Sequence, residues 1–352
     1  MKLLFTGGGS AGHVTPNLAL IESFTALGDT CLYVGSADGI EARLVTSVPF
    51  HTIASGKLRR YFSWQNFVDP FKIAFGLLQA LLICLREKPD IVFSKGGFVA
   101  VPVVYAAWLC RIPVICHESD VTPGLANRLC LPVIRRICLN FEETLRYVPN
   151  DRAVVTGTPL RSELTQGDAA RGRAFLGFDT TRPVLLVFGG SLGAQAINTL
   201  VWRNLAALTE EFQVCHVVGD GQVNASADAP GYVQKPYIRE EFGDVLMAAD
   251  IVVSRAGANA LYELLSLQRP HLLIPLTAVA SRGDQLANAR TFRDAGYSRV
   301  LEEQDATDEA FLESLWLLWR DREDVAAALA KFRRHDSVAT ITHLLRETAG
   351  NT

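Results

Sequence analysis

The sequence lacks the features that mark membrane-spanning, secreted and nucleic-acid-binding proteins. Its longest apolar runs, residues 73–85 and 98–110, are shorter than the roughly 18–20 residues that a helix needs to cross a bilayer. The start, MKLLFTGGG, breaks into glycines too early for a secretory leader. The formal net charge is only −3, so we expect no nucleic acid among the partners.

Cysteine occurs in an odd number and never in a C-x-x-C spacing, which argues against a disulfide scaffold and against a metal cluster. Most of the cysteines lie in apolar runs. We therefore expect reduced and mostly buried thiols in a cytoplasmic protein. The seven are Cys31, Cys84, Cys110, Cys116, Cys130, Cys138 and Cys215.

Apolar side chains make up 49% of the 352 residues and charged ones 20%, which suits a globular chain of two or three domains with large cores. Short apolar runs alternate with stretches of helical spacing, such as residues 17–27. This alternation predicts a parallel sheet that helices cover on both faces. The predicted strands of the first half lie in residues 2–6, 30–36, 89–97, 112–119 and 153–159.

The same design begins again after a polar, glycine-containing stretch that follows Pro159. An apolar run is followed by glycines and a helix at Gly7 and again at Gly189, about 180 residues later. We predict an α/β protein of two Rossmann-like domains, residues 1–158 and 159–334, which face each other across a cleft. The helix of residues 335–352 is expected to pack back on the first domain.

The first glycine loop, residues 7–12, matches G-x-G-x-x-G between a strand and a helix. Such a loop lets backbone N–H groups approach an anion such as phosphate. A tight turn without a ligand is an alternative. A nicotinamide cofactor is disfavoured, because the second strand runs into Gly35 and Ser36 and Asp38 comes late for a ribose contact. The second loop, residues 189–193, favours two phosphate-bearing substrates.

A third stretch, SRAGANALYE at residues 254–263, places a loop and a helix start before Glu263. A carboxylate in that position can accept hydrogen bonds from both hydroxyls of a ribose. The alternative is that Glu263 is an ordinary surface residue of a helix, since glutamate is a good helix former.

Seven motifs together resemble the MurG family of bacterial peptidoglycan synthesis. They are GGGSAGHVTP, KGGFVAVP, HESDVTPGLANR, GTPLR, GGSLGAQAIN, SRAGANALYE and RGDQLANA, in that order, and the resemblance extends from Leu3 to about Val300. It implies a GT-B glycosyltransferase that moves N-acetylglucosamine (GlcNAc) from UDP-GlcNAc to the 4-hydroxyl of the N-acetylmuramoyl sugar of lipid I, giving lipid II. The family inverts the anomeric centre and uses no metal and no cofactor. Accordingly, no Asp-x-Asp pair stands at a strand end.

The resemblance also implies which residues bind UDP-GlcNAc. These are Ser10, Ala11, Gly12, Asp120, Arg161, Ser191, Ile238, Ala258, Asn259, Ala260, Leu261, Tyr262, Glu263, Gln285 and Asn288. Ser191 is expected on the diphosphate, Ile238 against uracil, and Gln285 and Asn288 on the sugar. Relatives often carry Asn where this chain has Asp120, and an ionised Asp accepts but does not donate hydrogen bonds.

Three residues are candidates for the base that deprotonates the incoming hydroxyl. His13 is favoured, because it follows the first glycine loop and a free imidazole has a pKa of about 6.5. His117 and Glu118, at another strand end, stay open, as does a purely structural role for His13. By resemblance, the acceptor diphosphate would lie on Gly7, Gly8, Gly9, Lys95, Gly96 and Gly97. The alternative for Lys95 is an ordinary surface lysine.

The acceptor carries a polyprenyl chain, so we expect the protein at the cytoplasmic face of the cell membrane as a peripheral protein. The predicted contacts with an anionic bilayer are Lys57, Arg59, Arg60, Phe62, Trp64, Phe67 and Phe71. Residues 77–85 have the spacing of a core helix. Other cell-wall enzymes are further expected partners. Another GT-B glycosyltransferase with a lipid acceptor and a non-catalytic nucleotide-sugar-binding protein remain alternatives.

Overall fold

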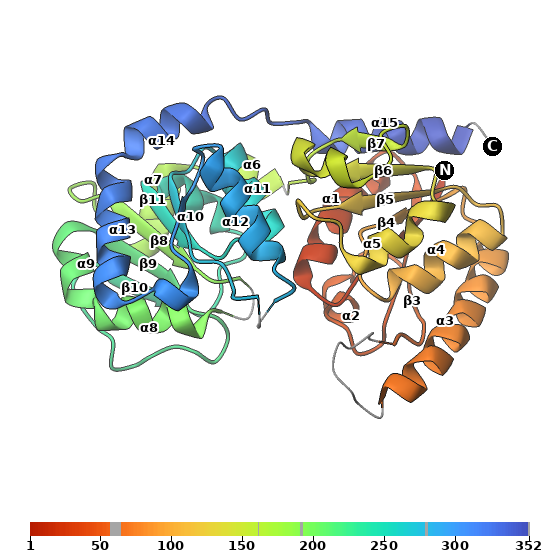
Figure 1. Ribbon diagram of the computed structural model, residues 1–352, viewed down its shortest axis with the longest axis horizontal. Coiled ribbons are helices and arrows are strands. Elements are labelled where there is room, and N and C mark those ends of the chain that lie inside the picture. Colours follow the sequence, from red (N-terminus) through yellow and green to blue (C-terminus); the bar gives the residue numbers. More distant parts are fainter. Residues whose placement is uncertain (57–64, 161, 191–192, 279–280, 351–352) are drawn as a thin grey trace. The chain divides into compact units, whose positions relative to one another are not determined.

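The structure, a computed structural model, describes residues 1–56, 65–160, 162–190, 193–278 and 281–350. Several predicted site residues lie outside these ranges: Lys57, Arg59, Arg60, Phe62, Trp64, Arg161 and Ser191, together with the side chain of Phe67. The chain forms two compact units, one of Met1–Arg161 with His335–Thr352 and the other of Ser162–Arg334 (Figure 1). Each unit is built on its own sheet.

The first unit contains a seven-stranded sheet in the order β3-β2-β1-β4-β5-β6-β7, and all of its paired strands are parallel. Its strands are β1 Lys2–Thr6, β2 Thr30–Gly35, β3 Phe50–Thr52, β4 Ile91–Ser94, β5 Val114–Glu118, β6 Arg136–Leu139 and β7 Ala153–Val155. The predicted α/β class with parallel sheets is thereby confirmed. The strands β3 and β6 lie outside the predicted apolar runs.

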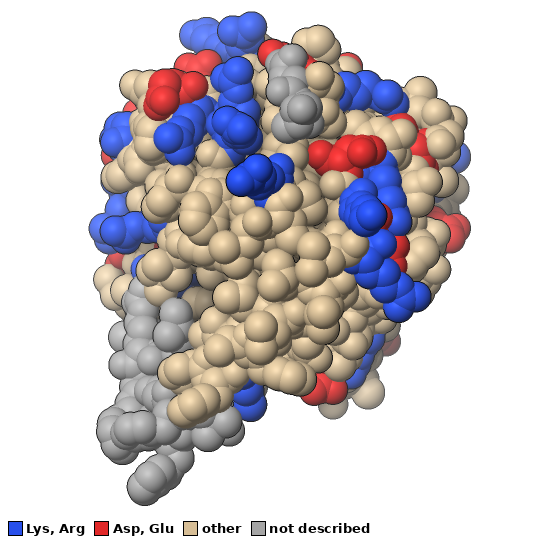
Figure 2. Space-filling model, turned by 90° about the vertical axis from the view of Figure 1, so that its right-hand side faces the viewer, with Lys and Arg blue, Asp and Glu red and all other residues tan. Residues whose placement is uncertain are grey.

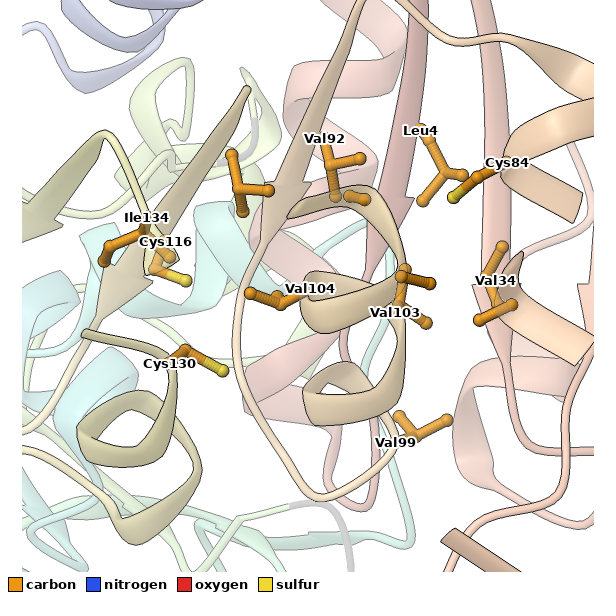
Figure 3. Close-up of a cluster of buried hydrophobic side chains, with 14 of the residues drawn as sticks. Leu4, Val34, Cys84, Val92, Val99, Val103, Val104, Cys116, Cys130 and Ile134 are labelled. Carbon is orange, nitrogen blue, oxygen red and sulfur yellow. The ribbon is translucent and has the colours of Figure 1, made fainter. Parts of the chain in front are cut away.

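Helices cover both faces of this sheet, because neighbouring residues of each strand point to opposite sides. Leu4 belongs to a core that also contains residues of α3 Gln65–Glu87, α4 Ala100–Leu109 and α5 Leu125–Cys130 (Figure 3). Leu3 and Phe5 belong to the core on the other face, with α1 Thr15–Ala26 and α15 Ser337–Gly350. The short α2 Ile40–Leu44 precedes β3.

The C-terminal helix α15 completes the core of the first unit. Ile341 and Leu345 are fully buried in one cluster with Leu20 and Phe24 of α1. The guanidinium of Arg346 lies 2.5 Å from a carboxylate oxygen of Asp29. Asp29 also accepts a hydrogen bond of 2.9 Å from the N-terminal amine, so the two ends of the chain meet at one carboxylate.

Helix α3 differs from the core helix that its spacing predicts. Leu77 and Leu81 pack against the core, whereas Leu78, Leu82 and Leu85 are exposed. The spacing argument was wrong for Leu85, which stands on the outer face of the helix. In the part of the chain that the structure describes, no helix is both long and apolar enough to cross a membrane.

The second unit contains a six-stranded parallel sheet in the order β10-β9-β8-β11-β12-β13. Its strands are β8 Val184–Phe188, β9 Gln213–Val217, β10 Tyr232–Lys235, β11 Ile251–Ser254, β12 His271–Leu273 and β13 Arg299–Val300. Its helices are α6 Ser162–Thr165, α7 Ala169–Leu176, α8 Gln195–Arg203, α9 Leu205–Glu211, α10 Phe242–Ala248, α11 Ala258–Ser266, α12 Asp284–Asp294, α13 Asp308–Arg320 and α14 Arg322–Leu329.

A buried hydrogen-bond network joins β9, β10 and α8 in this unit. His216 is fully buried, and its Nε2 donates to Oδ1 of Asn198 at 3.0 Å. Its Nδ1 accepts from the hydroxyl of Tyr232 at 2.9 Å, and that hydroxyl accepts from Trp202 at 3.0 Å. Burial lowers the pKa of His216 to about 3, and burial also lowers the pKa of His271 to about 4.

These two histidines predict that the protein loses stability in mild acid. Unfolded imidazoles take up protons below about pH 6.5, whereas the folded ones stay neutral down to about pH 4 or 3. The unfolded state therefore binds more protons as the pH falls through this window. At pH 5 each histidine should cost about 2 kcal/mol of the free energy of unfolding relative to pH 7. Urea unfolding at a series of pH values measures this change in the free energy of unfolding.

The variant His216→Gln should flatten this pH dependence, whatever its effect on stability at pH 7. His343, which is exposed on α15, provides the matched control, and His343→Gln should keep the wild-type slope. Equal slopes for His216→Gln and wild type would contradict the assignment of His216 as a buried neutral group.

Candidate functional site

The first glycine loop follows β1 and is fixed by a buried carboxylate. Glu41 of α2 is fully buried, and its Oε2 accepts from the backbone N–H of Gly9 at 3.1 Å. Its Oε1 accepts from the N–H of Ser36 at 3.0 Å and from the Ser36 hydroxyl. A Cβ at Gly8 would overlap this carboxylate, so the glycine is required by the close approach. Since the Gly9 amide already has an anionic partner, its contact with an acceptor diphosphate stays a prediction.

The second loop of this unit follows β4 and packs against the first, backbone to backbone. The N–H of Gly8 donates to the carbonyl of Gly96 at 3.3 Å. A Cβ at Gly97 would overlap the carbonyl oxygen of Gly8, and Gly97 has a positive φ of 84°. The two predicted phosphate loops therefore form one continuous surface at the carboxyl ends of β1 and β4.

Lys95, between β4 and these glycines, is a buried residue rather than a surface lysine, because only 1% of it is exposed. Its Nζ donates to Nδ1 of His117 at 2.7 Å, to the hydroxyl of Thr158 at 3.4 Å and to the hydroxyl of Ser119. The surface alternative for Lys95 was therefore wrong. A direct contact between its ammonium group and a diphosphate stays a prediction.

His117 uses both ring nitrogens inside the protein. Its Nε2 donates to the carbonyl of Gly157 at 2.9 Å, so Nδ1 carries the lone pair that accepts from Lys95. Burial, reinforced by the neighbouring Lys95 charge, lowers the pKa of His117 well below its ordinary value of 6.5. This geometry leaves His117 unsuited to take a proton from a substrate.

Glu118 holds the loop between β5 and α5. Its Oε1 accepts from the N–H groups of Ser119 at 2.8 Å and Asp120 at 3.0 Å. Its Oε2 accepts from the N–H of Gly124 at 2.9 Å and from Nδ2 of Asn127 at 2.9 Å. A buried carboxylate with four donors is a structural anion, so Glu118 is poorly placed to act as a base.

His13 is the remaining candidate base, and its tautomer can be read from its hydrogen bonds. It ends the short 3-10 helix Ala11–His13, and its Nδ1 lies 2.9 Å from the carbonyl oxygen of Gly8. A carbonyl only accepts, so Nδ1 carries the proton and Nε2 of the neutral ring carries the lone pair. The hydroxyl of Ser10 lies 3.2 Å from the same Nδ1. His13 is partly exposed, unlike His117 and Glu118.

The glycine loop of the second unit follows β8 and rests on the network of His216. A Cβ at Gly193 would overlap the carbonyl oxygen of Val218, and Gly193 has a positive φ of 76°. The same carbonyl accepts from Nδ2 of Asn198 at 2.9 Å. The loop leads into helix α8, whose N-terminus carries the partial positive charge that favours phosphate.

Helix α11 begins directly after the loop that follows β11. The predicted nucleotide contacts on this helix differ in their exposure. Asn259, Ala260 and Glu263 are partly exposed, whereas Leu261 and Tyr262 are fully buried and Ala258 nearly so. The buried members can reach a nucleotide only through backbone atoms. The side chain of Glu263 is exposed enough to reach a ligand, and its contact with a ribose stays a prediction.

The predicted sugar contacts Gln285 and Asn288 both belong to α12. Asn288 is fully buried, and its Nδ2 donates to the carbonyl of Ala256 at 3.2 Å, which braces the loop before α11. Gln285 is partly exposed, and its Oε1 accepts from the N–H of Leu276 at 3.1 Å; its contact with the sugar stays a prediction. Ile238 is only 5% exposed.

The sequence analysis did not identify several residues that hold the loops of the site in place. Glu41 has no signal beyond its place two residues after Gly39, and Asn198 and His216 come from separate elements. Arg255 lies inside a motif, and its buried guanidinium pairs with Glu303 and donates to the carbonyl of Ile274 at 2.9 Å. These contacts link residues far apart in the sequence, which local patterns do not reveal.

Comparison with known proteins places both units in described families. Residues 3–138 match the glycosyltransferase family 28 N-terminal domain, and residues 184–341 match the family 28 C-terminal domain. A Clostridium botulinum (strain Loch Maree / Type A3) protein is 47% identical over 349 residues, covering 98% of this chain and 99% of its own. A Geobacillus kaustophilus (strain HTA426) protein is 47% identical over 352 residues, covering 99% of each chain. Both are named UDP-N-acetylglucosamine–N-acetylmuramyl-(pentapeptide) pyrophosphoryl-undecaprenol N-acetylglucosamine transferase.

Solved structures agree with these sequence relatives. The crystal structure of Acinetobacter baumannii MurG matches with a TM-score of 0.77 and 25% identity, covering 98% of this chain and 99% of that one. A UDP-GlcNAc 2-epimerase from Neisseria meningitidis, solved with UDP-GlcNAc bound, shares the fold with a TM-score of 0.71 at 15% identity, covering 99% of this chain and 100% of that one. The predicted GT-B fold is thereby confirmed.

The role of Glu118 predicts a loss of stability when its charge is removed without a change of shape. Glu118→Gln places an amide N–H group against N–H donors, so at least one buried donor loses its acceptor. The free energy of unfolding should fall by about 1–3 kcal/mol. Glu142→Gln, at an exposed position, is the control and should stay within about 0.5 kcal/mol of wild type. Wild-type stability for Glu118→Gln would show that the carboxylate does not hold the loop.

Proposed function

The chain belongs to glycosyltransferase family 28, and on that premise we propose that it transfers GlcNAc from UDP-GlcNAc to the 4-hydroxyl of the N-acetylmuramoyl sugar of lipid I, giving lipid II. Lipid I is the undecaprenyl-pyrophosphoryl N-acetylmuramoyl pentapeptide. The observation that carries the proposal is the 47% identity, over nearly the full chain, to proteins named for this transfer. The reaction places the chain in bacterial peptidoglycan synthesis.

We assign the donor to the second unit. The diphosphate of UDP-GlcNAc would lie on the loop of residues 189–193 and at the N-terminus of α8, where backbone N–H groups stabilise the charge of the departing UDP. Glu263 would accept from the ribose hydroxyls, and Gln285 would contact the sugar. Arg161 and Ser191 belong to the same proposal but lie outside the described residues.

We propose that His13 is the base that deprotonates the acceptor hydroxyl. The transfer is an in-line displacement that inverts the anomeric centre and, in our proposal, uses no metal. It needs a base within hydrogen-bond reach of the attacking hydroxyl. The hydrogen bond of Nδ1 to Gly8 fixes the ring so that Nε2 offers its lone pair. The Glu118 loop would hold Asp120 toward the sugars, with Asp120 as an acceptor only.

The assay that tests this proposal offers labelled UDP-GlcNAc and a lipid I analogue in the presence of a chelator. Wild type should form the disaccharide product. His13→Ala should lower kcat by about 10²-fold to 10⁴-fold, which is the usual contribution of a general base. The KM for UDP-GlcNAc should change little, because the proposed role of His13 is to deprotonate the acceptor hydroxyl and not to bind the donor.

His51→Ala is the control, since His51 is a half-exposed histidine of β3 away from both glycine loops, and it should retain wild-type kcat. Near-normal kcat for His13→Ala would remove His13 as the base. A wild-type protein that binds UDP-GlcNAc yet forms no disaccharide would favour a nucleotide-sugar-binding protein instead.

We further propose that one face of the first unit contacts the cytoplasmic surface of the membrane. Phe71, among the predicted contacts, is 77% exposed on α3, and Trp108 is 51% exposed on the neighbouring α4. The exposed apolar residues of α3, α4 and α5 are Phe71, Phe75, Leu78, Leu82, Leu85, Trp108, Leu109, Leu125 and Leu129. Figure 2 shows a broad uncharged face, bordered by charged groups that include several lysines and arginines as well as acidic residues. Exposed apolar area beside cations suits an anionic lipid surface.

Charges placed on this face should weaken binding to vesicles that contain phosphatidylglycerol. The double variant Leu82→Asp with Trp108→Asp should lower the fraction that cosediments, with an affinity loss of at least about tenfold, since each buried side chain contributes about 1.5–3 kcal/mol. Leu27 is 60% exposed at the end of α1, which covers the opposite face of the sheet, so Leu27→Asp should bind as wild type. Unchanged binding of the double variant would place the membrane contact elsewhere.

A further inference from the structure

Lys95 is a buried ammonium group with a complete set of hydrogen-bond partners. Its three N–H groups face three acceptors, the Nδ1 of His117 and the hydroxyls of Ser119 and Thr158. All three acceptors are neutral, because His117 is a neutral imidazole. Within the described ranges, the ion pairs found in the structure include none for Lys95.

A buried charge without an ion pair is costly to the folded state. Burial lowers the pKa of Lys95 from 10.5 to about 7, although Glu118, Asp120 and Cys138 act in the opposite direction. An apolar side chain of similar length would avoid this cost. The three hydrogen bonds offset part of this cost, and the places of their acceptors indicate a further role for the lysine.

The contacts of Lys95 reach three separate strand ends. Its backbone N–H donates to the carbonyl of Thr6 at 2.9 Å, and its Cβ faces Gly7, so it backs the loop that leads to His13. Its Nζ donates to Ser119, next to Asp120. Through Thr158, and through the bond of His117 to Gly157, it also binds the segment that follows β7.

That last segment leads out of the first unit, whose boundary falls at Arg161. Parallel sheets bind their ligands at the carboxyl ends of the strands. One residue thus connects both loops that carry proposed substrate contacts with the start of the crossover to the second unit: its backbone contacts the first loop, and its ammonium group contacts Ser119 and Thr158.

We propose that Lys95 is a positioning residue for the transfer, which holds the loops of His13 and Asp120 in register with the segment of residues 156–158. The inference rests on the proposed function. It differs from a direct contact with the acceptor diphosphate, because Lys95 acts through Ser119, His117 and Thr158. It also differs from a purely structural role, since it predicts a loss of turnover without a loss of stability.

The test is Lys95→Met in the lipid I assay, where methionine fills the space of the lysine stem without its charge. We expect kcat to fall by about 10-fold to 100-fold, the effect of a small misplacement of reacting groups. The KM values for UDP-GlcNAc and for the acceptor should stay within about twofold. The Tm should stay close to that of wild type, because removal of a buried charge offsets the loss of three hydrogen bonds.

Two further variants complete the experiment. Lys331→Met removes an exposed lysine of the second unit and should leave kcat unchanged. Ser119→Ala with Thr158→Val keeps Lys95 and removes two of its acceptors. It should lower kcat in the same direction, which guards against a Lys95→Met protein that does not fold.

The outcomes separate the explanations. Unchanged kcat with a lowered Tm would overturn the inference in favour of a structural role. Unchanged kcat with a raised acceptor KM would overturn it in favour of a direct diphosphate contact. An active wild type with unaffected variants refutes the inference alone, whereas an inactive wild type refutes the proposed function and the inference with it.

Discussion

The carboxyl edge of the first sheet depends on the close backbone packing around Gly8. Its N–H donates to Gly96, its carbonyl accepts from His13, and its α-carbon leaves no room for a Cβ beside Glu41. A side chain at this position would overlap the Glu41 carboxylate, and a side chain at Gly97 would overlap the carbonyl oxygen of Gly8. The glycines here serve first to bring backbone and carboxylate together, and the surface offered to a substrate follows from that packing.

The histidines show how one residue type acquires different chemistry from its surroundings. His117 and His216 are fully buried and use both ring nitrogens within the protein, so burial holds them neutral and they act as fixed connectors. The Nδ1 of His13 is hydrogen-bonded to a carbonyl, which sets its tautomer, while the ring stays partly exposed. The difference lies in position, since His117 is inside a strand and His13 ends a short helix beyond one. Exposure, together with a defined tautomer, is thus what distinguishes the proposed base from the buried histidines.

The sequence predicted the fold well, because strands buried on both faces leave continuous apolar runs that end in glycine, as at β1, β4 and β8. It missed β3, β6, β10 and β13. Of these, β3 and β13 are short and partly exposed, and β6 and β10 have only four residues each, so no long apolar run marks them. For the site, the motifs located the right loops but misjudged single side chains. The alternative of an ordinary surface position for Lys95 was wrong, although lysine is usually exposed. Leu85 was predicted to be buried, since spacing alone does not show which face meets the core. Glu41 and Glu118 act through partners on other elements, and only the folded chain brings these partners together.

In the first unit, the buried charged side chains discussed above gather near the carboxyl edge of the sheet, and this placement has a physical reason. The strands of this unit bury mainly apolar side chains, whereas the buried charged groups Glu41, Lys95 and Glu118 lie at or beyond the carboxyl ends of strands. Buried charges cost free energy unless hydrogen bonds satisfy them. Loops cannot satisfy their own N–H groups as strands do, so carboxylates that accept several N–H bonds give these loops a fixed shape. The fold thus spends part of its marginal stability at the edge where substrates are expected, because catalysis requires loops that keep their geometry.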